Sequence, residues 1–274
     1  MDNLVKTIVS LKEKFAKEYA GNSYIHEVIP LSSSELFSIN ESNLEMLHKF
    51  ASCNPIYYNS FEMKINEIPC MVYEGDINQY WLDSIKHDTS YAPFYPTWIL
   101  SAYALGLETK KLGFEQVIDI GSGDGRISYC AKVVGLESYA IEIDEQLVEL
   151  QKGLVSKTGI NFNPEHSDAT KFDYSSLKLS NPALFISGLP EMGEMLANSV
   201  INIIVSMPNL KKTSAFVLTG SHQMRKNSRD TSKWGWGLLI ENFGLKVIKT
   251  ITLPTRWTVD QPIDTPYVFV TSFH

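Results

Sequence analysis

Glycines alternate with other residues directly after an apolar run near the middle of the chain. The run 117–120 reads Val-Ile-Asp-Ile and is followed by Gly121, Gly123 and Gly125. An apolar run of this length predicts a buried parallel strand, and the helical spacing of apolar residues after Gly125 predicts a helix directly behind the loop. Glycine is required where a ligand approaches the backbone closely or where a turn needs a positive φ. This stretch therefore predicts a strand, loop and helix that bind a nucleoside cofactor.

Two carboxylates accompany this loop. Asp119 lies two residues before the first glycine, and Glu142 ends the next predicted strand, 138–142. A dinucleotide loop has the spacing G-x-G-x-x-G and binds a pyrophosphate at a helix N-terminus, where an acid such as Asp119 would repel it. An acid at that position suits an ammonium group, and Glu142 can accept two charge-assisted hydrogen bonds from hydroxyl groups. The pattern favours a cofactor with a cationic end over a dinucleotide.

The combination resembles the first motif of the class I S-adenosylmethionine (SAM) methyltransferases. The resemblance implies that Asp119 lies near the methionine amino group of SAM and that Glu142 binds both ribose hydroxyls. The segment 165–169, Glu-His-Ser-Asp-Ala, resembles the family segment whose acid contacts the adenine amino group, although an acid such as Asp168 is also a common cap or turn residue. The cofactor-binding residues implied are Asp119, Gly121, Ser122, Gly123, Gly125, Glu142, Ile143, Asp168, Ala169 and Ser187.

The order of the predicted elements is that of an α/β domain. Strands are expected at 116–120, 138–142, 160–164, 183–187, 214–219, 245–252 and 266–272, with helices between most of them. Methyltransferases of this class have a Rossmann-like sheet of seven strands whose last strand is antiparallel. The resemblance implies that fold for residues 90–274.

Residues 1–89 are expected to form a smaller mixed α+β region. Helical patterns end near Gly21 and run from about 41 to 53, and two strand-like segments, 61–65 and 69–73, predict a hairpin. A cap over the cofactor, a partner-binding surface and a substrate platform all suit such a region. We also interpret the irregular stretch 220–233 as a substrate-side lid.

The methyl acceptor is indicated by the end of the fourth strand. Enzymes that methylate amino groups of bases or of glutamine have Asn/Asp-Pro-Pro-aromatic there, whereas residues 187–190 read Ser-Gly-Leu-Pro and offer neither the stacking ring nor the amide or acid. With the glycine motif, the segments 188–192 and 91–97 resemble the archaeal and mitochondrial seven-strand protein-lysine methyltransferases. This resemblance covers roughly residues 90–220 and implies a protein lysine as the acceptor.

A lysine acceptor needs a deprotonated amine, because its ordinary pKa is about 10.4. Burial against aromatic rings disfavours the ammonium form, while the ring faces still attract it. We expect Tyr91, Phe94 and Tyr95 to supply such rings and Glu191 to receive the proton or bind the cation; Tyr91, Tyr95 and Glu191 are the catalytic candidates. The alternatives are that the aromatic residues pack a domain junction and that Glu191 caps the next helix. No metal is needed, since a sulfonium carries its own leaving group.

Composition limits the remaining function classes. The net charge of −7 argues against wrapping long nucleic acid, although residues 225–233 hold a local basic stretch that is most simply a solvated loop. No apolar stretch approaches the roughly 20 residues that cross a bilayer, and no signal-peptide pattern is present, so we expect a cytoplasmic protein. Cys53, Cys70 and Cys130 are expected to be buried free thiols. Methylation of a small metabolite or RNA, and non-catalytic SAM binding, are the alternative functions.

For two polar residues at the end of the glycine loop we expect no catalytic role. Asp124 is interpreted as an acid at the start of the following helix, and Arg126 as a solvated or ion-paired side chain.

Overall fold

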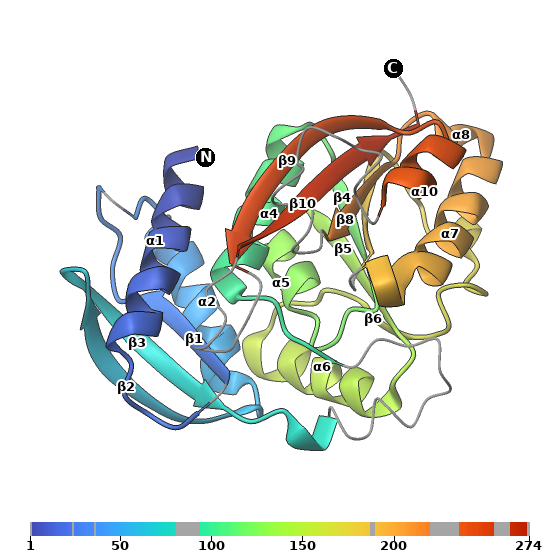
Figure 1. Cartoon of the computed structure of the whole chain (residues 1–274). Coiled ribbons are helices and arrows are strands. Elements are labelled where there is room, and N and C mark those ends of the chain that lie inside the picture. The colour runs from blue at the N-terminus through green and yellow to red at the C-terminus, as the bar shows by residue number, and fades with distance from the viewer. Residues whose placement is uncertain are drawn as a thin grey trace.

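A seven-stranded sheet forms the centre of the larger part of the molecule (Figure 1). The computed structural model describes residues 2–23, 25–35, 37–80, 94–186, 190–219, 236–254 and 264–272. The strands are β4 (Gln116–Ile120), β5 (Glu137–Glu142), β6 (Pro164–His166), β7 (Pro182–Ile186), β8 (Ala215–Thr219), β9 (Lys246–Pro254) and β10 (Asp264–Thr271), in the spatial order β6-β5-β4-β7-β8-β10-β9. The first five pair in parallel, and β10 runs antiparallel to both β8 and β9. The predicted seven-strand α/β fold with an antiparallel last strand is confirmed.

Six of the seven strands begin and end within two residues of the predicted positions. The third differs, because it was expected at 160–164 and β6 occupies Pro164–His166. Phe162, which lies within the predicted range, is fully buried in the core but belongs to the segment that precedes β6. Asn163 has a φ of 52°, which is incompatible with an extended strand at that residue. The strand therefore begins four residues later than predicted.

Helices cover both faces of the sheet. They are α4 (Ile99–Lys111), α5 (Arg126–Val133), α6 (Glu145–Thr158), α7 (Pro190–Ser206), the short α8 (Pro208–Lys211) and α10 (Gly237–Asn242). Successive strand residues point to opposite faces, so Val117 and Phe185 pack with the apolar residues of α4, α5 and α6, while Ile118 and Leu184 pack with those of α7 and α10. Burial on both faces explains why these strands are continuous apolar runs.

The N-terminal region has a three-stranded antiparallel sheet and two helices. Its elements are α1 (Asp2–Glu18), β1 (Ile25–Pro30), α2 (Glu41–Cys53), β2 (Tyr57–Ile65) and β3 (Ile68–Gly75), with strand order β1-β3-β2. Both predicted helices and the hairpin are present. Strand β1 was not predicted: all six of its residues are buried, but His26 and Glu27 interrupt its apolar pattern.

This region shares a core with the α/β part. Phe15 of α1 and Phe50 of α2 belong to the same buried cluster as Trp98 and Tyr129. Helix α1 contacts β9 and α4, and α2 contacts α5 and α6, so the two blue helices of Figure 1 pack directly on the larger unit. The boundary proposed at residue 89 falls in 81–93, outside the described residues.

The three cysteines are free thiols. Cys70 and Cys130 are buried free thiols as predicted, whereas the free thiol of Cys53 is only partly buried. Within the described ranges, no helix has the length and apolar character needed to cross a bilayer. The stretch 220–233 lies outside the described residues.

Candidate functional site

The glycine loop between β4 and α5 has the left-handed backbone that its sequence predicted. Gly121, Gly123 and Gly125 have φ values of 67°, 58° and 78°. A Cβ atom on Gly123 would lie 2.6 Å from the ring of Phe94, and one on Gly125 would lie 2.4 Å from the ring of Phe162. Both conformation and close approach therefore exclude side chains at these positions.

Asp119 is the last polar residue of β4 before the loop. Its side chain is fully buried, and neither carboxylate oxygen accepts a hydrogen bond of ordinary geometry from a described residue. Burial raises its pKa to about 8, the carboxylates of Glu142 and Asp124 add to the rise, and the Ser128 amide and hydroxyl oppose it. Such a group is costly to the folded protein, because a buried carboxylate normally has a partner.

Glu142, at the end of β5, reaches across to the loop that follows β4. Its Oε2 accepts a hydrogen bond from the Gly123 amide at 2.7 Å, and its Oε1 accepts from the Ile143 and Asp144 amides at 2.8 and 3.0 Å. The side chain is 6% exposed, and burial raises its pKa against the opposing effect of these amides. A carboxylate offers about four acceptor positions, so one position on Oε2 remains.

Gln151 of α6 binds the loop at Ser122 and Gly123. The Gln151 amide donates to the Ser122 hydroxyl at 2.9 Å and to the Gly123 carbonyl at 2.7 Å. The carbonyl oxygen of Gln151 is buried and has no hydrogen-bond partner among the described residues. Helix α6 thereby also holds the loop, through Gln151.

Asp168 makes the local contacts of a turn residue. Its carboxylate accepts from the Thr170 amide and hydroxyl at 2.9 and 2.7 Å and pairs with Lys171 at 2.9 Å. Burial alone would raise its pKa, but the hydrogen bonds from Thr170 and Lys171 outweigh that effect and the pKa is lowered. Ala169 is buried, and Ser167 donates its amide to the Glu142 carbonyl at 2.9 Å, which places this segment beside the end of β5.

Asp124 and Arg126 are both buried. The expectation that Arg126 is solvated is therefore wrong, and the alternative expectation, an ion-paired side chain, is confirmed. The two side chains are 1% and 2% exposed and form a buried ion pair, with Arg126 Nε donating to Asp124 Oδ1 at 2.9 Å. Arg126 also pairs with Glu27 of β1. Sequence reasoning did not find Glu27; the only signal was an acid inside an otherwise apolar segment.

Of the three catalytic candidates, only Tyr95 has a described side chain. Tyr95 is 49% exposed, next to the buried Phe94 whose ring contacts Gly123. Glu191 is the second residue of α7, directly after β7, and its side chain lies outside the description. Tyr91 and Ser187 fall outside the described residues. The structure thus places Phe94 at the loop, and the grouping of the three catalytic candidates stays a prediction.

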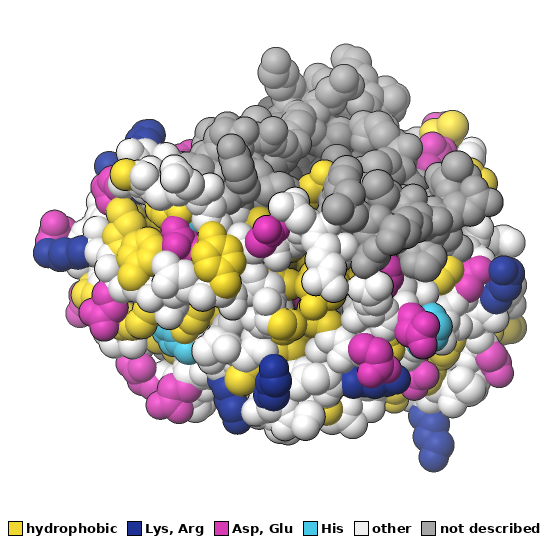
Figure 2. All heavy atoms as spheres, turned by 90° about the horizontal axis from the view of Figure 1, so that it is seen from below, with side chains coloured by type: hydrophobic (Ala, Val, Ile, Leu, Met, Phe, Trp, Pro, Cys, Tyr) yellow, Lys and Arg dark blue, Asp and Glu magenta, His cyan; other side chains and the backbone are white. Residues whose placement is uncertain are grey.

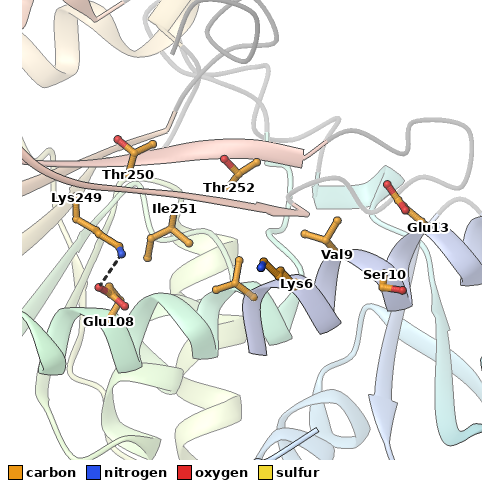
Figure 3. A pocket seen from close by; sticks show the side chains of 10 residues that line it. Lys6, Val9, Ser10, Glu13, Glu108, Lys249, Thr250, Ile251 and Thr252 are labelled. Atoms are coloured by element: carbon orange, nitrogen blue, oxygen red, sulfur yellow. Dashed lines mark ion pairs between the residues drawn. The ribbon is translucent and has the colours of Figure 1, made fainter. Parts of the chain in front are cut away.

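Two surface regions lie away from the loop. Figure 3 shows a groove of about 470 Å³ between α1, α4 and β9, in which Lys249 pairs with the buried Glu108 at 3.9 Å. It holds none of the predicted site residues. On the face seen in Figure 2, the described basic side chains are interspersed with acidic ones and form no continuous patch.

No protein-family model and no curated protein matches this sequence. Several solved structures are similar to the chain at low identity. A Pyrococcus horikoshii protein provisionally described as an RNA methyltransferase is 14% identical over 73% of this chain and 100% of its own, with a TM-score of 0.47. The M. jannaschii tRNA m1G37 methyltransferase is 14% identical over 64% of this chain and 49% of its own, with a TM-score of 0.45. A SAM-dependent methyltransferase from Clostridium acetobutylicum is 8% identical over 64% of this chain and 92% of its own, with a TM-score of 0.44.

Proposed function

We propose that this protein is a SAM-dependent methyltransferase whose cofactor binds at the ends of β4 and β5. The observation that carries the proposal is the convergence of two buried carboxylates, Asp119 and Glu142, on one glycine loop with left-handed backbone. The ends of parallel strands are where ligands bind in open α/β sheets. SAM would supply a methyl group bound to a sulfonium, an electrophile that carries its own leaving group.

The residues present fit two polar groups of SAM, the methionine ammonium and the ribose hydroxyls. Asp119 accepts no hydrogen bond of ordinary geometry from the described residues, and an ammonium group is the kind of partner that would stabilise its ionised form. Glu142 has one acceptor position left beyond its three backbone amides, so one ribose hydroxyl can bind there and a second requires that an amide be released. The adenine would lie beside the segment of Asp168 and Ala169, where the Asp168 carboxylate already has local partners.

For the acceptor we propose a protein lysine. The net charge of −7 favours a cationic partner over a polyanion such as RNA. The Phe94 ring lies against the glycine loop, and the half-exposed Tyr95 is the next residue in the chain, so an aromatic ring adjoins the proposed cofactor position. Glu191, in the first turn of the helix that follows β7, is proposed to receive the proton that the lysine must lose.

Calorimetric titration with SAM, with NAD as the control ligand, tests the cofactor. We expect selective micromolar binding of SAM; binding of NAD alone, or of neither, would overturn the proposal. Incubation of the protein and radioactive SAM with cell extract then tests the acceptor. Label in a protein band that is lost when lysines are chemically blocked supports lysine methylation, whereas label in RNA or in the small-molecule fraction would establish the alternative acceptor classes. SAM binding without any labelled acceptor would favour a non-catalytic module.

A further inference from the structure

Arg126, the first residue of α5, uses all of its hydrogen-bond donors in a buried site. Its Nε and Nη2 donate to the Asp124 carboxylate at 2.9 and 2.5 Å, and Nη2 also donates to the Tyr57 hydroxyl at 3.2 Å. Its Nη1 donates to the Glu27 carboxylate and to the Thr97 carbonyl. A guanidinium has five N–H donors in a fixed plane, so this geometry determines the position of every partner.

The partners of Arg126 come from the N-terminal region as well as from the loop. Glu27 Oε1 accepts from the Tyr57 hydroxyl at 3.0 Å, and Oε2 accepts from the Ile99 amide, at the start of α4, at 2.9 Å. Asn54, which ends α2, donates its side-chain amide to Asp124 Oδ2 at 2.9 Å. The cluster therefore joins β1, β2 and α2 to the loop that contains the proposed cofactor site.

The cluster holds the part of that loop that contains Gly123 and Gly125. Asp124 lies between Gly123 and Gly125, two residues without a Cβ whose φ values are 58° and 78°. Fixing the side chains of Asp124 and Arg126 on either side of Gly125 restricts backbone torsions that glycine alone would leave free. The same backbone includes the Gly123 amide, which donates to Glu142.

We propose that Glu27, acting through Arg126, is a positioning residue for the cofactor loop, so that the N-terminal region is an integral part of the cofactor site. This inference deepens the proposed function and rests on it for the identity of the cofactor. Both Glu27 oxygens accept hydrogen bonds, so an amide at this position would direct an N–H donor at another donor and break one link between Arg126 and the N-terminal region. The Arg126–Asp124 pair stays balanced in charge, so the loop is expected to lose its fixed geometry before the fold is lost.

Glu27→Gln tests the proposal, because it keeps the shape of the side chain and removes its charge. Glu108→Gln is the matched control: Glu108 is also a buried carboxylate paired with a cation, but it joins α4 to β9 in the groove of Figure 3. Tyr57→Phe is the milder second variant, since it removes only one hydroxyl from the cluster. Two quantities are measured for each full-length protein: amide hydrogen exchange over 121–126 without ligand, and the dissociation constant for SAM.

We expect exchange over 121–126 to accelerate at least about 10-fold and SAM affinity to fall by about 10-fold in Glu27→Gln. Tyr57→Phe is expected to shift both quantities in the same direction by about 3-fold, and this comparison decides the matter if Glu27→Gln does not fold. Unchanged loop exchange in the folded variants, or an equal change in Glu108→Gln, would overturn the positioning role. If the unmodified protein does not bind SAM, the cofactor proposal fails, whereas the exchange measurement still tests the coupling of Glu27 to the loop.

Discussion

Replacing Asp119 by Asn tests whether this carboxylate destabilises the folded protein in order to bind a cation. Its pKa is about 8 in the folded protein against an ordinary value of 3.8. The folded state therefore holds the proton more tightly than the unfolded state. The stability lost to Asp119 is zero below about pH 4, grows between about pH 4 and pH 8, and is constant above that range.

The size of the effect at neutral pH follows from the same values. At about 1.36 kcal/mol per pH unit, the interval of roughly three units between 3.8 and pH 7 corresponds to about 4 kcal/mol of lost stability. An Asn side chain has no charge, but it buries N–H donors without partners, which costs about 1–3 kcal/mol. We therefore expect Asp119→Asn to raise the free energy of unfolding at pH 7 by about 1–3 kcal/mol.

Urea denaturation of both proteins at several pH values measures this difference. The stability advantage of the variant is expected to grow by about 1.4 kcal/mol per pH unit from about pH 5 to pH 7. The same substitution at Asp173, which is exposed, serves as the matched control. In calorimetry the variant should bind SAM more weakly by about 1.5–3 kcal/mol, because a charged hydrogen-bond partner is lost.

Two results would refute this reasoning. A stability difference that does not change with pH would show that Asp119 does not titrate in the folded protein as its burial indicates. A variant that is more stable and binds SAM as tightly as the unmodified protein would show that the carboxylate is not a cofactor ligand. Greater stability together with weaker binding is the pattern expected of a group retained for function.

Three further changes are predicted. Glu142→Ala should weaken SAM binding by about 1.5–3 kcal/mol in calorimetry and, because Glu142 accepts three backbone amides, should also lower the melting temperature; unchanged binding by a folded variant would contradict its ribose role. Gly123→Ala should destabilise the protein by more than the roughly 1–2 kcal/mol of a left-handed residue, because its Cβ would lie 2.6 Å from the Phe94 ring, and Phe94→Leu in the same chain should recover part of the loss in thermal melts. Asp144→Ala removes the cap that accepts from the amides of the first turn of α6 at 2.9 and 3.1 Å, so it should cost about 0.5–2 kcal/mol in urea denaturation.

The sequence was sufficient for the order of the elements and for the conformation of the loop, because both depend on local patterns. Apolar runs that are buried on both faces of a parallel sheet show their strand character without any partner. The positive φ values at Gly121, Gly123 and Gly125 follow from the residue type. Strand β1 was missed for the opposite reason, because the acid within it is compatible with a buried strand only when its partner, Arg126, is known.

The burial and the hydrogen-bond partners of the site residues depend on contacts between segments far apart in the chain. The spacing identified Asp119 and Glu142 as candidates, but only the packing of α4 and α5 on the sheet buries Asp119 where no described residue gives it a hydrogen bond of ordinary geometry. Only the pairing of β4 with β5 brings Glu142 to the Gly123 amide. Likewise, Arg126 is a buried member of a cluster because β1 lies beside the loop. A local pattern specifies backbone conformation, whereas burial and pairing, which set the energy of a charge, are properties of the folded chain.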